Sequence, residues 1–191
     1  MKIWQLLFAC LALAGCVPDG KPKAQGSAKQ VNLYLQADPI SMDPRVTYER
    51  RSIQVNRELF EGLVRIGENG TPELALASSY TASEDGKVYT FHLRPAKWSN
   101  GMPVTASDFE YAWKSTLDKS LPASAAYLLF IIKNARKAHL GESPIEEVGV
   151  HAVDPSTLEV TLEHAAPYFF EFLALTPFSP VCQAVVEKNP A

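Results

Sequence analysis

Side chains that could carry out catalysis or hold a metal ion are few in this sequence, and their spacing is unfavourable. The four histidines stand at positions 92, 139, 151 and 164, and none forms the close pair that a metal ion favours. The sequence contains no Gly-x-Ser-x-Gly, His-Glu-x-x-His or Cys-x-x-Cys motif and no glycine-rich phosphate loop. We therefore predict no catalytic residue, no metal site and no cofactor, and we expect a protein that is not an enzyme.

The clearest candidate for chemistry is Cys16, which ends the segment MKIWQLLFACLALAGC. A lysine, an apolar stretch from Ile3 to Leu13 and two small residues are typical of a secretory signal peptide over residues 1–15. The ending Leu-Ala-Gly-Cys resembles the bacterial lipobox, which predicts lipid attachment at Cys16 and a membrane partner through that lipid. An ordinary signal peptide followed by an incidental cysteine is the alternative.

The residues after the lipobox predict a spacer and a single free thiol. Residues 16–30 are rich in proline, glycine and lysine, which predicts a lipidated N-terminus followed by a flexible tether. Cys10 would leave with the signal peptide, so Cys182 would have no partner for an internal disulfide. Its apolar context predicts a small buried side chain, because a nucleophile would need a histidine nearby.

The composition is that of an ordinary globular protein. Of the 191 residues, 47% are hydrophobic and 20% are charged. Lys and Arg total 18 against 21 Asp and Glu, which gives a formal net charge of −3. Because a phosphate backbone is bound mainly by excess positive charge, we predict no nucleic-acid partner. The length suits one domain or two small ones.

Hydrophobic periodicity predicts the elements that carry these residues. The predicted strands are Val31–Gln36, Leu63–Ile66, Val88–Leu93 and a hairpin of Val148–Val153 with Thr157–Glu163. The predicted helices are Ser52–Leu63, one that opens at Thr105, Ala123–Leu140 and a short aromatic one that begins at Pro167. Helices and strands are interspersed, which favours an α+β or mixed α/β fold over a bundle or a sandwich.

The helix that opens at Thr105 has the best-defined start. Thr105 is the predicted N-cap, and Asp108 stands three residues later, where an acidic side chain suits the exposed amides. Phe109 and Trp113 then lie on one stripe of the helix. We expect this stripe to pack the helix onto the sheet.

Several blocks of the sequence together resemble the oligopeptide-binding, or family 5, extracellular solute-binding proteins of ABC importers. The blocks are Ser41–Pro44, Arg57–Leu63, Pro72–Ser78, Val148–Val150, Thr157–Leu162, Pro167–Phe169 and, most densely, YTFHLRPAKWSNGMPVTASDFEYAW over Tyr89–Trp113. They follow the family's order across roughly residues 31–188, which a chance match to one motif would not produce.

The resemblance implies the N-terminal part of a two-lobed, periplasmic-binding-protein-like fold of type II with an extra small domain. It implies the start of lobe one over residues 31–62, the small domain over 63–179 and the return to lobe one over 180–191. Family members are much longer, so we expect a truncated chain without the second lobe. In the family that lobe supplies charged partners for both ends of a peptide.

The resemblance also implies where a ligand would lie. In relatives the loop that corresponds to residues 46–51 borders the ligand, which makes Tyr48 and Arg50 candidate ligand-binding residues. Relatives of the oligopeptide type carry an acidic residue near the position of Tyr48, and this chain has Glu49 beside it. Relatives also place a tyrosine where this chain has Ser124. Both differences bear on peptide specificity.

Arg57 is the third candidate ligand-binding residue, as a charged wall of the pocket. The alternative is a solvated helix residue that pairs with Glu58 or Glu61.

The function implied by the resemblance is capture of oligopeptides and their delivery to an ABC permease and its ATPase. The expected location is the periplasm or cell surface, with a lipid anchor in a bacterial membrane. One alternative keeps the fold and changes the ligand to nickel, haem, a sugar or another solute. The other is a truncated, non-binding remnant or an interaction module.

Overall fold

The computed structural model describes residues 32, 34–46 and 48–189. The predicted signal peptide, the predicted lipid site at Cys16 and the predicted tether lie outside the described residues. From Leu35 onward the described residues belong to one compact unit, which contains every helix and strand given below.

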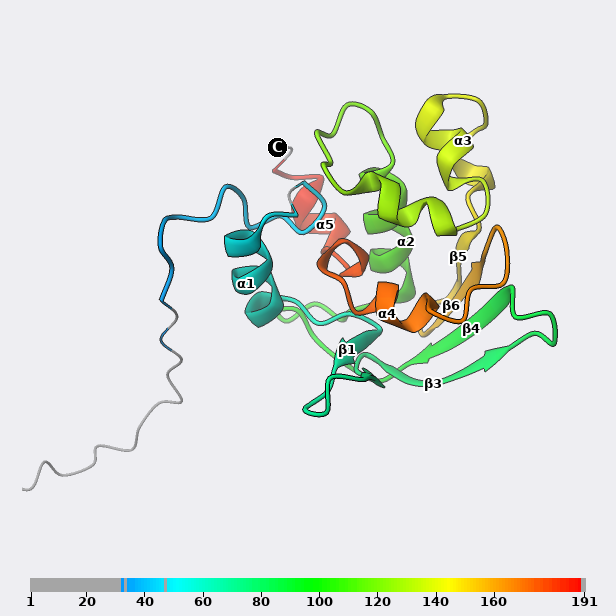
Figure 1. The fold of residues 1–191 in the computed structure, drawn as a ribbon, viewed down its shortest axis with the longest axis horizontal. Coiled ribbons are helices and arrows are strands. Elements are labelled where there is room, and N and C mark those ends of the chain that lie inside the picture. The colour runs from blue at the N-terminus through cyan, green and yellow to red at the C-terminus, as the bar shows by residue number, and fades with distance from the viewer. Residues whose placement is uncertain (1–31, 33, 47, 190–191) are drawn as a thin grey trace, which may run out of the picture. The chain divides into compact units, whose positions relative to one another are not determined.

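Four antiparallel strands form the main sheet in the order β3-β4-β6-β5 (Figure 1). They are β3 (Ala77–Ala82), β4 (Val88–Leu93), β5 (Val150–Asp154) and β6 (Thr157–Thr161). A separate two-stranded sheet pairs β1 (Val64–Ile66) with β2 (Pro72–Leu74). The predicted strands over residues 63–66 and 88–93 and the predicted hairpin are thus confirmed.

The remaining elements are short helices and turns. They are α1 (Arg50–Leu59), α2 (Ala106–Thr116), α3 (Ala135–Leu140), α4 (Phe169–Leu173) and α5 (Gln183–Val186), with 3₁₀ turns at η1 (Ala126–Ile131), η2 (Ile145–Glu147) and η3 (Thr176–Phe178). The mixture of helices and antiparallel strands agrees with the predicted fold class.

The core lies between α2 and the main sheet. α2 packs against β5 and β6, and its residues Phe109 and Trp113 have no exposed surface. The indole Nε1 of Trp113 donates a hydrogen bond to the carbonyl oxygen of Phe178 at 3.0 Å. The expected packing of this stripe on the sheet is confirmed.

The start of α2 also agrees with the sequence. Thr105 is the N-cap in extended conformation, and its backbone N–H donates to Oδ2 of Asp108 at 2.9 Å. The same carboxylate oxygen accepts a bond from Nε1 of Trp98 at 3.2 Å, and Oδ1 accepts one from the backbone N–H of Gln183 at 3.2 Å. Asp108 therefore joins the helix start to two other segments.

An aromatic cluster packs α4 onto the strands β3 and β4. Phe170 lies with its ring centroid 4.7 Å from that of Tyr80, and Phe169 lies 5.0 Å from Tyr89 and 6.4 Å from Phe91. The predicted aromatic helix exists, and its aromatic side chains are what attach it to the sheet.

The single helix predicted over Ala123–Leu140 is wrong. The segment forms η1 and α3, separated at Ile132–Asn134. Ile132 makes an isolated bridge with Leu162, and the N–H of Lys133 donates to the carbonyl of Thr161 at 2.9 Å. Asn134 then takes a left-handed conformation, with φ of 59°. Tertiary pairing with the end of β6 outweighs the local helical pattern here.

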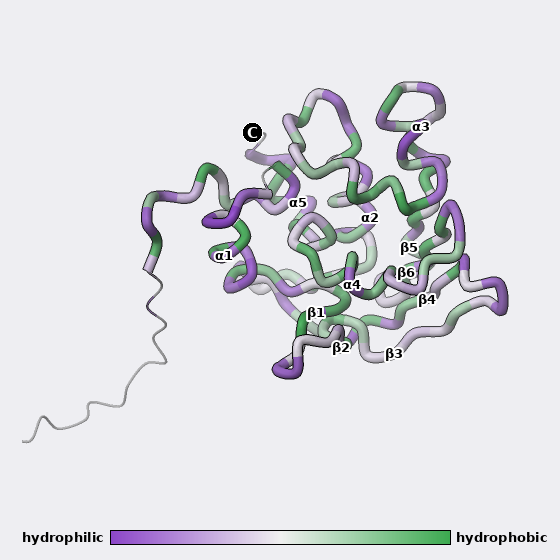
Figure 2. The backbone as a smooth tube through the Cα atoms, in the orientation of Figure 1, coloured by the Kyte–Doolittle hydropathy of each residue, from purple (hydrophilic) through white to green (hydrophobic). Residues whose placement is uncertain are grey.

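The strand predicted over Val31–Gln36 is also wrong at the positions that the structure describes. Residues 32 and 34–36 show no strand. An alternating pattern only permits a strand, which forms when a neighbouring strand supplies hydrogen-bond partners. Hydrophobic and hydrophilic stretches alternate along the chain (Figure 2), and no helix among the described residues is long and apolar enough to cross a membrane.

Candidate functional site

The segment that leads into α1 begins with a turn at Asp43, Pro44 and Arg45. Oδ1 of Asp43 accepts bonds from the backbone N–H and from Nε of Arg45, at 2.9 and 3.0 Å. Nη2 of Arg45 forms an ion pair with Oδ2 of Asp43 at 2.6 Å. The arginine is 5% exposed. Burial opposes its charge, but the hydrogen bond and the attraction of Asp43 outweigh burial and raise the pKa of Arg45.

The guanidinium of Arg45 also reaches α2. Its Nη1 donates to Oγ of Ser115 at 3.1 Å, and its central carbon lies 6.0 Å from the ring centroid of Tyr111. Sequence reasoning missed this residue. The available signal was an aspartate two positions before an arginine with a proline between them, a spacing that favours a local ion pair within a turn.

Tyr48 and Ser124, two positions that the resemblance marks, are in contact. The backbone N–H of Tyr48 donates to Oγ of Ser124 at 3.2 Å. The backbone N–H of Ser124 donates to the carbonyl oxygen of Val46 at 3.1 Å. The structure thus brings the loop before α1 beside the loop before η1.

Glu49 is the N-cap of α1, and its carboxylate accepts hydrogen bonds from the first turn of the helix. Oε1 accepts from the backbone N–H and from Oγ of Ser52 at 2.6 and 2.7 Å, and Oε2 accepts from the N–H of Arg51 at 2.9 Å. The bond from the Ser52 hydroxyl, followed by the bond from the Arg51 amide, lowers the pKa of Glu49 to about 2. Glu49 is therefore ionised, and its carboxylate is engaged in capping the helix.

Arg50 and Arg57 lie together on the outer face of α1. Both are exposed, and with Ile53, Gln54 and Glu58 they line a shallow hollow of about 550 Å³. Tyr48 does not line this hollow. The three predicted ligand residues therefore divide into an arginine pair on the helix and a tyrosine at its entry.

The alternative for Arg57 is a solvated helix residue that pairs with Glu58 or Glu61: its side chain is exposed, and no ion pair joins it to either glutamate within the described residues. Glu61 forms its ion pairs with Arg65, at 3.5 Å, and with Arg94. Arg57 is thus left as an exposed cation on the rim of a second hollow, of about 570 Å³, between α1 and residues 173–179.

This second hollow has polar walls beneath α1. Asn56 is 1% exposed and Thr176 is 3% exposed. Nδ2 and Oδ1 of Asn56 and Oγ1 of Thr176 are buried and have no hydrogen-bond partner among the described residues. Leaving such groups unpaired costs free energy, so this side of α1 is the least well satisfied part of the described structure.

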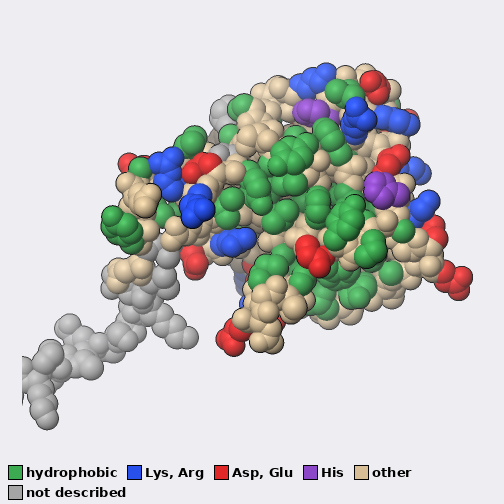
Figure 3. Space-filling view, in the orientation of Figure 1, with side chains coloured by type: hydrophobic (Ala, Val, Ile, Leu, Met, Phe, Trp, Pro, Cys, Tyr) green, Lys and Arg blue, Asp and Glu red, His purple; other side chains and the backbone are tan. Residues whose placement is uncertain are grey.

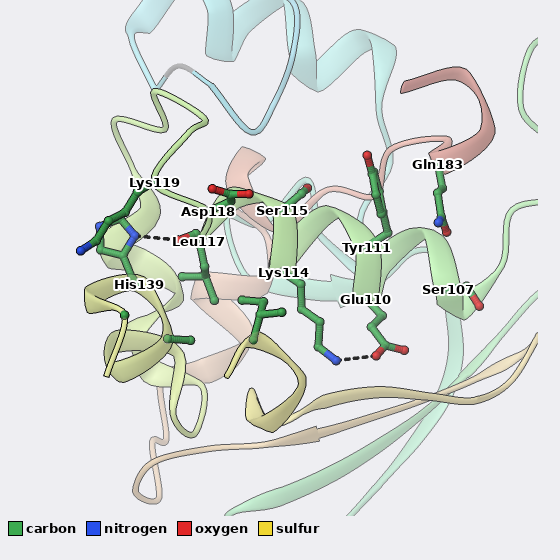
Figure 4. A pocket seen from close by; sticks show the side chains of 13 residues that line it. Ser107, Glu110, Tyr111, Lys114, Ser115, Leu117, Asp118, Lys119, His139 and Gln183 are labelled. Atoms are coloured by element: carbon green, nitrogen blue, oxygen red, sulfur yellow. Dashed lines mark hydrogen bonds and ion pairs between the residues drawn. The ribbon is translucent and has the colours of Figure 1, made fainter. Parts of the chain in front are cut away.

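A third hollow, of about 620 Å³, follows the outer side of α2 (Figure 4). Lys114 and Glu110 point toward one another in it and form an ion pair at 2.6 Å. Burial opposes ionisation of Glu110, but the bonds from Lys114 and from the N–H of Ala152 lower its pKa. Nδ1 of His139 donates to the carbonyl of Leu117 at 2.9 Å. Polar side chains that line this hollow are thus held in ion pairs and hydrogen bonds within the protein.

The described residues contain no group of three or more His, Cys, Asp or Glu side chains that could hold a metal ion. Cys182 is a free, partly buried thiol.

Hydrophobic side chains gather over the centre of one face, with charged ones around them (Figure 3). The large hydrophobic side chains that are more than half exposed are Tyr34, Ile40, Met42, Leu59, Tyr127 and Val153. An apolar region on one face, such as Figure 3 shows, is typical of surfaces that contact another molecule.

Comparison with known proteins gives a consistent result. A family model described as bacterial extracellular solute-binding proteins, family 5 middle, matches residues 71–190. The chain is 40% identical over 191 residues to the oligopeptide-binding protein OppA of Bacillus subtilis, covering 99% of this chain and 35% of that protein. It is 38% identical over 187 residues to the periplasmic oligopeptide-binding protein OppA of Escherichia coli, covering 96% of this chain and 34% of that protein.

Solved structures of similar proteins share the fold. The substrate-binding domain of an oligopeptide ABC transporter from Bacillus anthracis has a TM-score of 0.76 and 44% identity, over 78% of this chain and 29% of that one. OppA of Listeria monocytogenes bound to peptide has a TM-score of 0.76 and 36% identity, over 78% of this chain and 30% of that one. The chain therefore spans about a third of the length of the relatives that it matches.

Proposed function

This chain belongs to family 5 of the bacterial extracellular solute-binding proteins, and on that basis we propose that it captures oligopeptides for an ABC importer. The observation that carries the proposal is the similarity over nearly the whole chain to proteins that are named for binding oligopeptides. The arrangement around α1 supports it, because two exposed arginines line one hollow of that helix.

The proposed mechanism is capture without bond making. Arg50 and Arg57 present two guanidinium groups on one exposed helix face, which suits carboxylate groups of a peptide. Tyr48 lies at the entry to the helix, where its side chain would border the same ligand. Glu49 is engaged as a cap, so the amino group of the peptide would be bound by other residues.

The remaining parts of the proposal follow from the sequence. Cys16 would carry a lipid after removal of residues 1–15, and residues 16–30 would tether the protein at the periplasmic side or the cell surface. Residues 31–62 and 180–191 would belong to lobe one, and residues 63–179 to the small domain. An ABC permease and its ATPase would be the protein partners, and no catalysis is proposed.

A second candidate is capture of a different solute by the same fold. The chain is 36% identical over 187 residues to a protein of Escherichia coli named as a probable deoxycholate-binding periplasmic protein. An amphipathic carboxylate could use the same arginine pair as a peptide carboxylate.

Isothermal titration of the 191-residue chain tests the two candidates. One titration uses a pool of random tri- to pentapeptides, and the other uses deoxycholate. We expect saturable binding of the peptide pool that weakens in Arg50→Gln and Arg57→Gln, whereas Arg136→Gln, an exposed arginine of α3, serves as the matched control. Binding of deoxycholate alone would favour the second candidate. A folded chain that binds neither would refute both for this chain.

A further inference from the structure

Arg45 is buried although it lies in a loop outside the main core. A buried guanidinium is costly unless every part of it has a partner. Here Nε and Nη2 contact Asp43 within the same turn, and Nη1 donates to Ser115 on α2. The guanidinium also lies beside the ring of Tyr111 on that helix. The sequence separation between Arg45 and Ser115 is 70 residues, so the contact is tertiary. The side chain therefore ties the turn before α1 to the surface of α2.

Ser124 supplies a second attachment to the same loop, three residues further on. Its hydroxyl accepts from the N–H of Tyr48, and its own N–H donates to the carbonyl of Val46. The two bonds hold the carbonyl oxygen of Val46 and the amide of Tyr48 against Ser124. Without them, the carbonyl of Val46 and the amide of Tyr48 would lose the protein partners that the structure gives them.

Both attachments lie just before α1, and the second holds the backbone amide of Tyr48. We propose that Arg45 and Ser124 are positioning residues for peptide capture, which hold the backbone at Val46 and Tyr48 in its binding-competent place. Neither residue contacts the ligand in this proposal. The inference rests on the proposed function, because it assigns a role to residues that support the same site.

The size of the effect follows from the population of the ordered loop. Apparent affinity falls in proportion to the fraction of molecules that are binding-competent. If removal of one attachment leaves the loop ordered in about a tenth of the molecules, the apparent affinity falls about tenfold. Preorganisation of this kind changes affinity without changing any contact with the ligand.

Two measurements on the 191-residue chain test the inference. The first is amide hydrogen exchange at Tyr48, and the second is titration with the pool of tri- to pentapeptides. The variants are Arg45→Met, Arg45→Lys and Ser124→Ala. Arg94→Met is the matched control, because Arg94 also pairs with one carboxylate and donates to one further oxygen, but both of its partners lie outside residues 43–50.

We expect exchange at Tyr48 to rise about tenfold in Arg45→Met and in Ser124→Ala, with a matching loss of peptide affinity. Arg45→Lys should fall between wild type and Arg45→Met, because lysine keeps the charge beside Asp43 but lacks the planar fork that also reaches Ser115. Arg94→Met should lower the melting temperature and change neither readout. If Arg45 had only a structural role, Arg45→Met would resemble Arg94→Met: the melting temperature would fall, and exchange at Tyr48 and peptide affinity would not change.

Unchanged exchange at Tyr48 in Arg45→Lys and Ser124→Ala would overturn the inference, and so would raised exchange with unchanged peptide affinity. If Arg45→Met does not fold, these two milder variants decide the question. If the wild-type chain binds no peptide, the proposed function fails, and the exchange experiment still decides whether the two residues hold the loop.

Discussion

Two regions of the molecule are stabilised in different ways. The sheet body, residues 63–181, surrounds large apolar side chains without exposed surface, such as Phe91 and Trp113. The α1 segment, described over residues 41–46 and 48–59, instead buries polar side chains, of which Arg45 and Ser52 are hydrogen-bonded and Asn56 is not. The first region therefore depends on burial of apolar area, which is not directional. The second depends on particular hydrogen bonds, each of which has one geometry.

The difference bears on where a ligand would bind. Regions with few buried apolar contacts open at lower free energy than the core of a domain, and binding residues are often found on them. All three candidate ligand residues, Tyr48, Arg50 and Arg57, belong to the α1 segment. The candidate ligand residues thus belong to the region that polar contacts hold, beside a body with an apolar core.

The largest expected effect is in the core of the sheet body. Trp113→Ala removes a fully buried indole and its bond to the carbonyl of Phe178, and should cost about 3–5 kcal/mol of unfolding free energy. Urea denaturation of the full chain measures it. Tyr127→Ala, at a side chain that is 59% exposed, is the control and should change stability by less than about 0.5 kcal/mol. Similar losses for both variants would show that the sheet body has no such core.

A smaller effect is expected where the sheet body uses polar contacts. Asp108→Ala removes the acceptor for Thr105, Trp98 and Gln183, and should cost about 2 kcal/mol by the same denaturation measurement. Glu146→Ala, an exposed acid in the first turn of η2, is the matched control. A loss no larger than that of the control would mean that burial alone positions α2.

The sheet body could be predicted from sequence to the extent that periodicity reflects burial. The strand Val88–Leu93 and the cap at Thr105 are found as predicted, because local pattern and tertiary packing agree there. The helix over Ala123–Leu140 is not, because the bridge between Ile132 and Leu162 joins residues that no local pattern relates.

The α1 segment could be predicted only in part. The predicted helix begins at Ser52 and leaves Arg50 in the preceding loop, whereas the structure begins α1 at Arg50 and places Arg50 and Arg57 at one hollow. The bond between Arg45 and Ser115 and the bond between Tyr48 and Ser124 join residues 70 and 76 positions apart, which no local spacing encodes. Sequence therefore indicates that a helix lies here, whereas its first turn and the bonds that precede it require the structure.

The third effect should have the opposite sign to those in the sheet body. Asn56→Leu replaces an unpaired buried amide with an apolar group of the same branching, and should stabilise the chain by about 1 kcal/mol. Ser52→Ala is the contrasting variant in the same helix, because its hydroxyl is bonded to Glu49, and it should destabilise. Thermal unfolding of both variants makes the test. If Asn56→Leu destabilises the chain, the amide has a partner, and the α1 segment does not bury an unpaired polar group at this position.

The smallest expected effect is a pH dependence confined to the α1 segment. The folded pKa of Glu49, about 2, lies below its ordinary value of 4.5, so its contribution to the cap is complete above about pH 4.5 and is lost as pH falls toward 2. The amide resonance of Ser52 should therefore shift with a midpoint near pH 2, and Glu49→Gln should abolish the shift, whereas Glu58→Gln should not. The amide of Phe91 in the sheet body should not follow this titration. A midpoint near 4.5 would mean that the carboxylate does not cap the helix, and it would return Glu49 to the residues available for the amino group of a peptide.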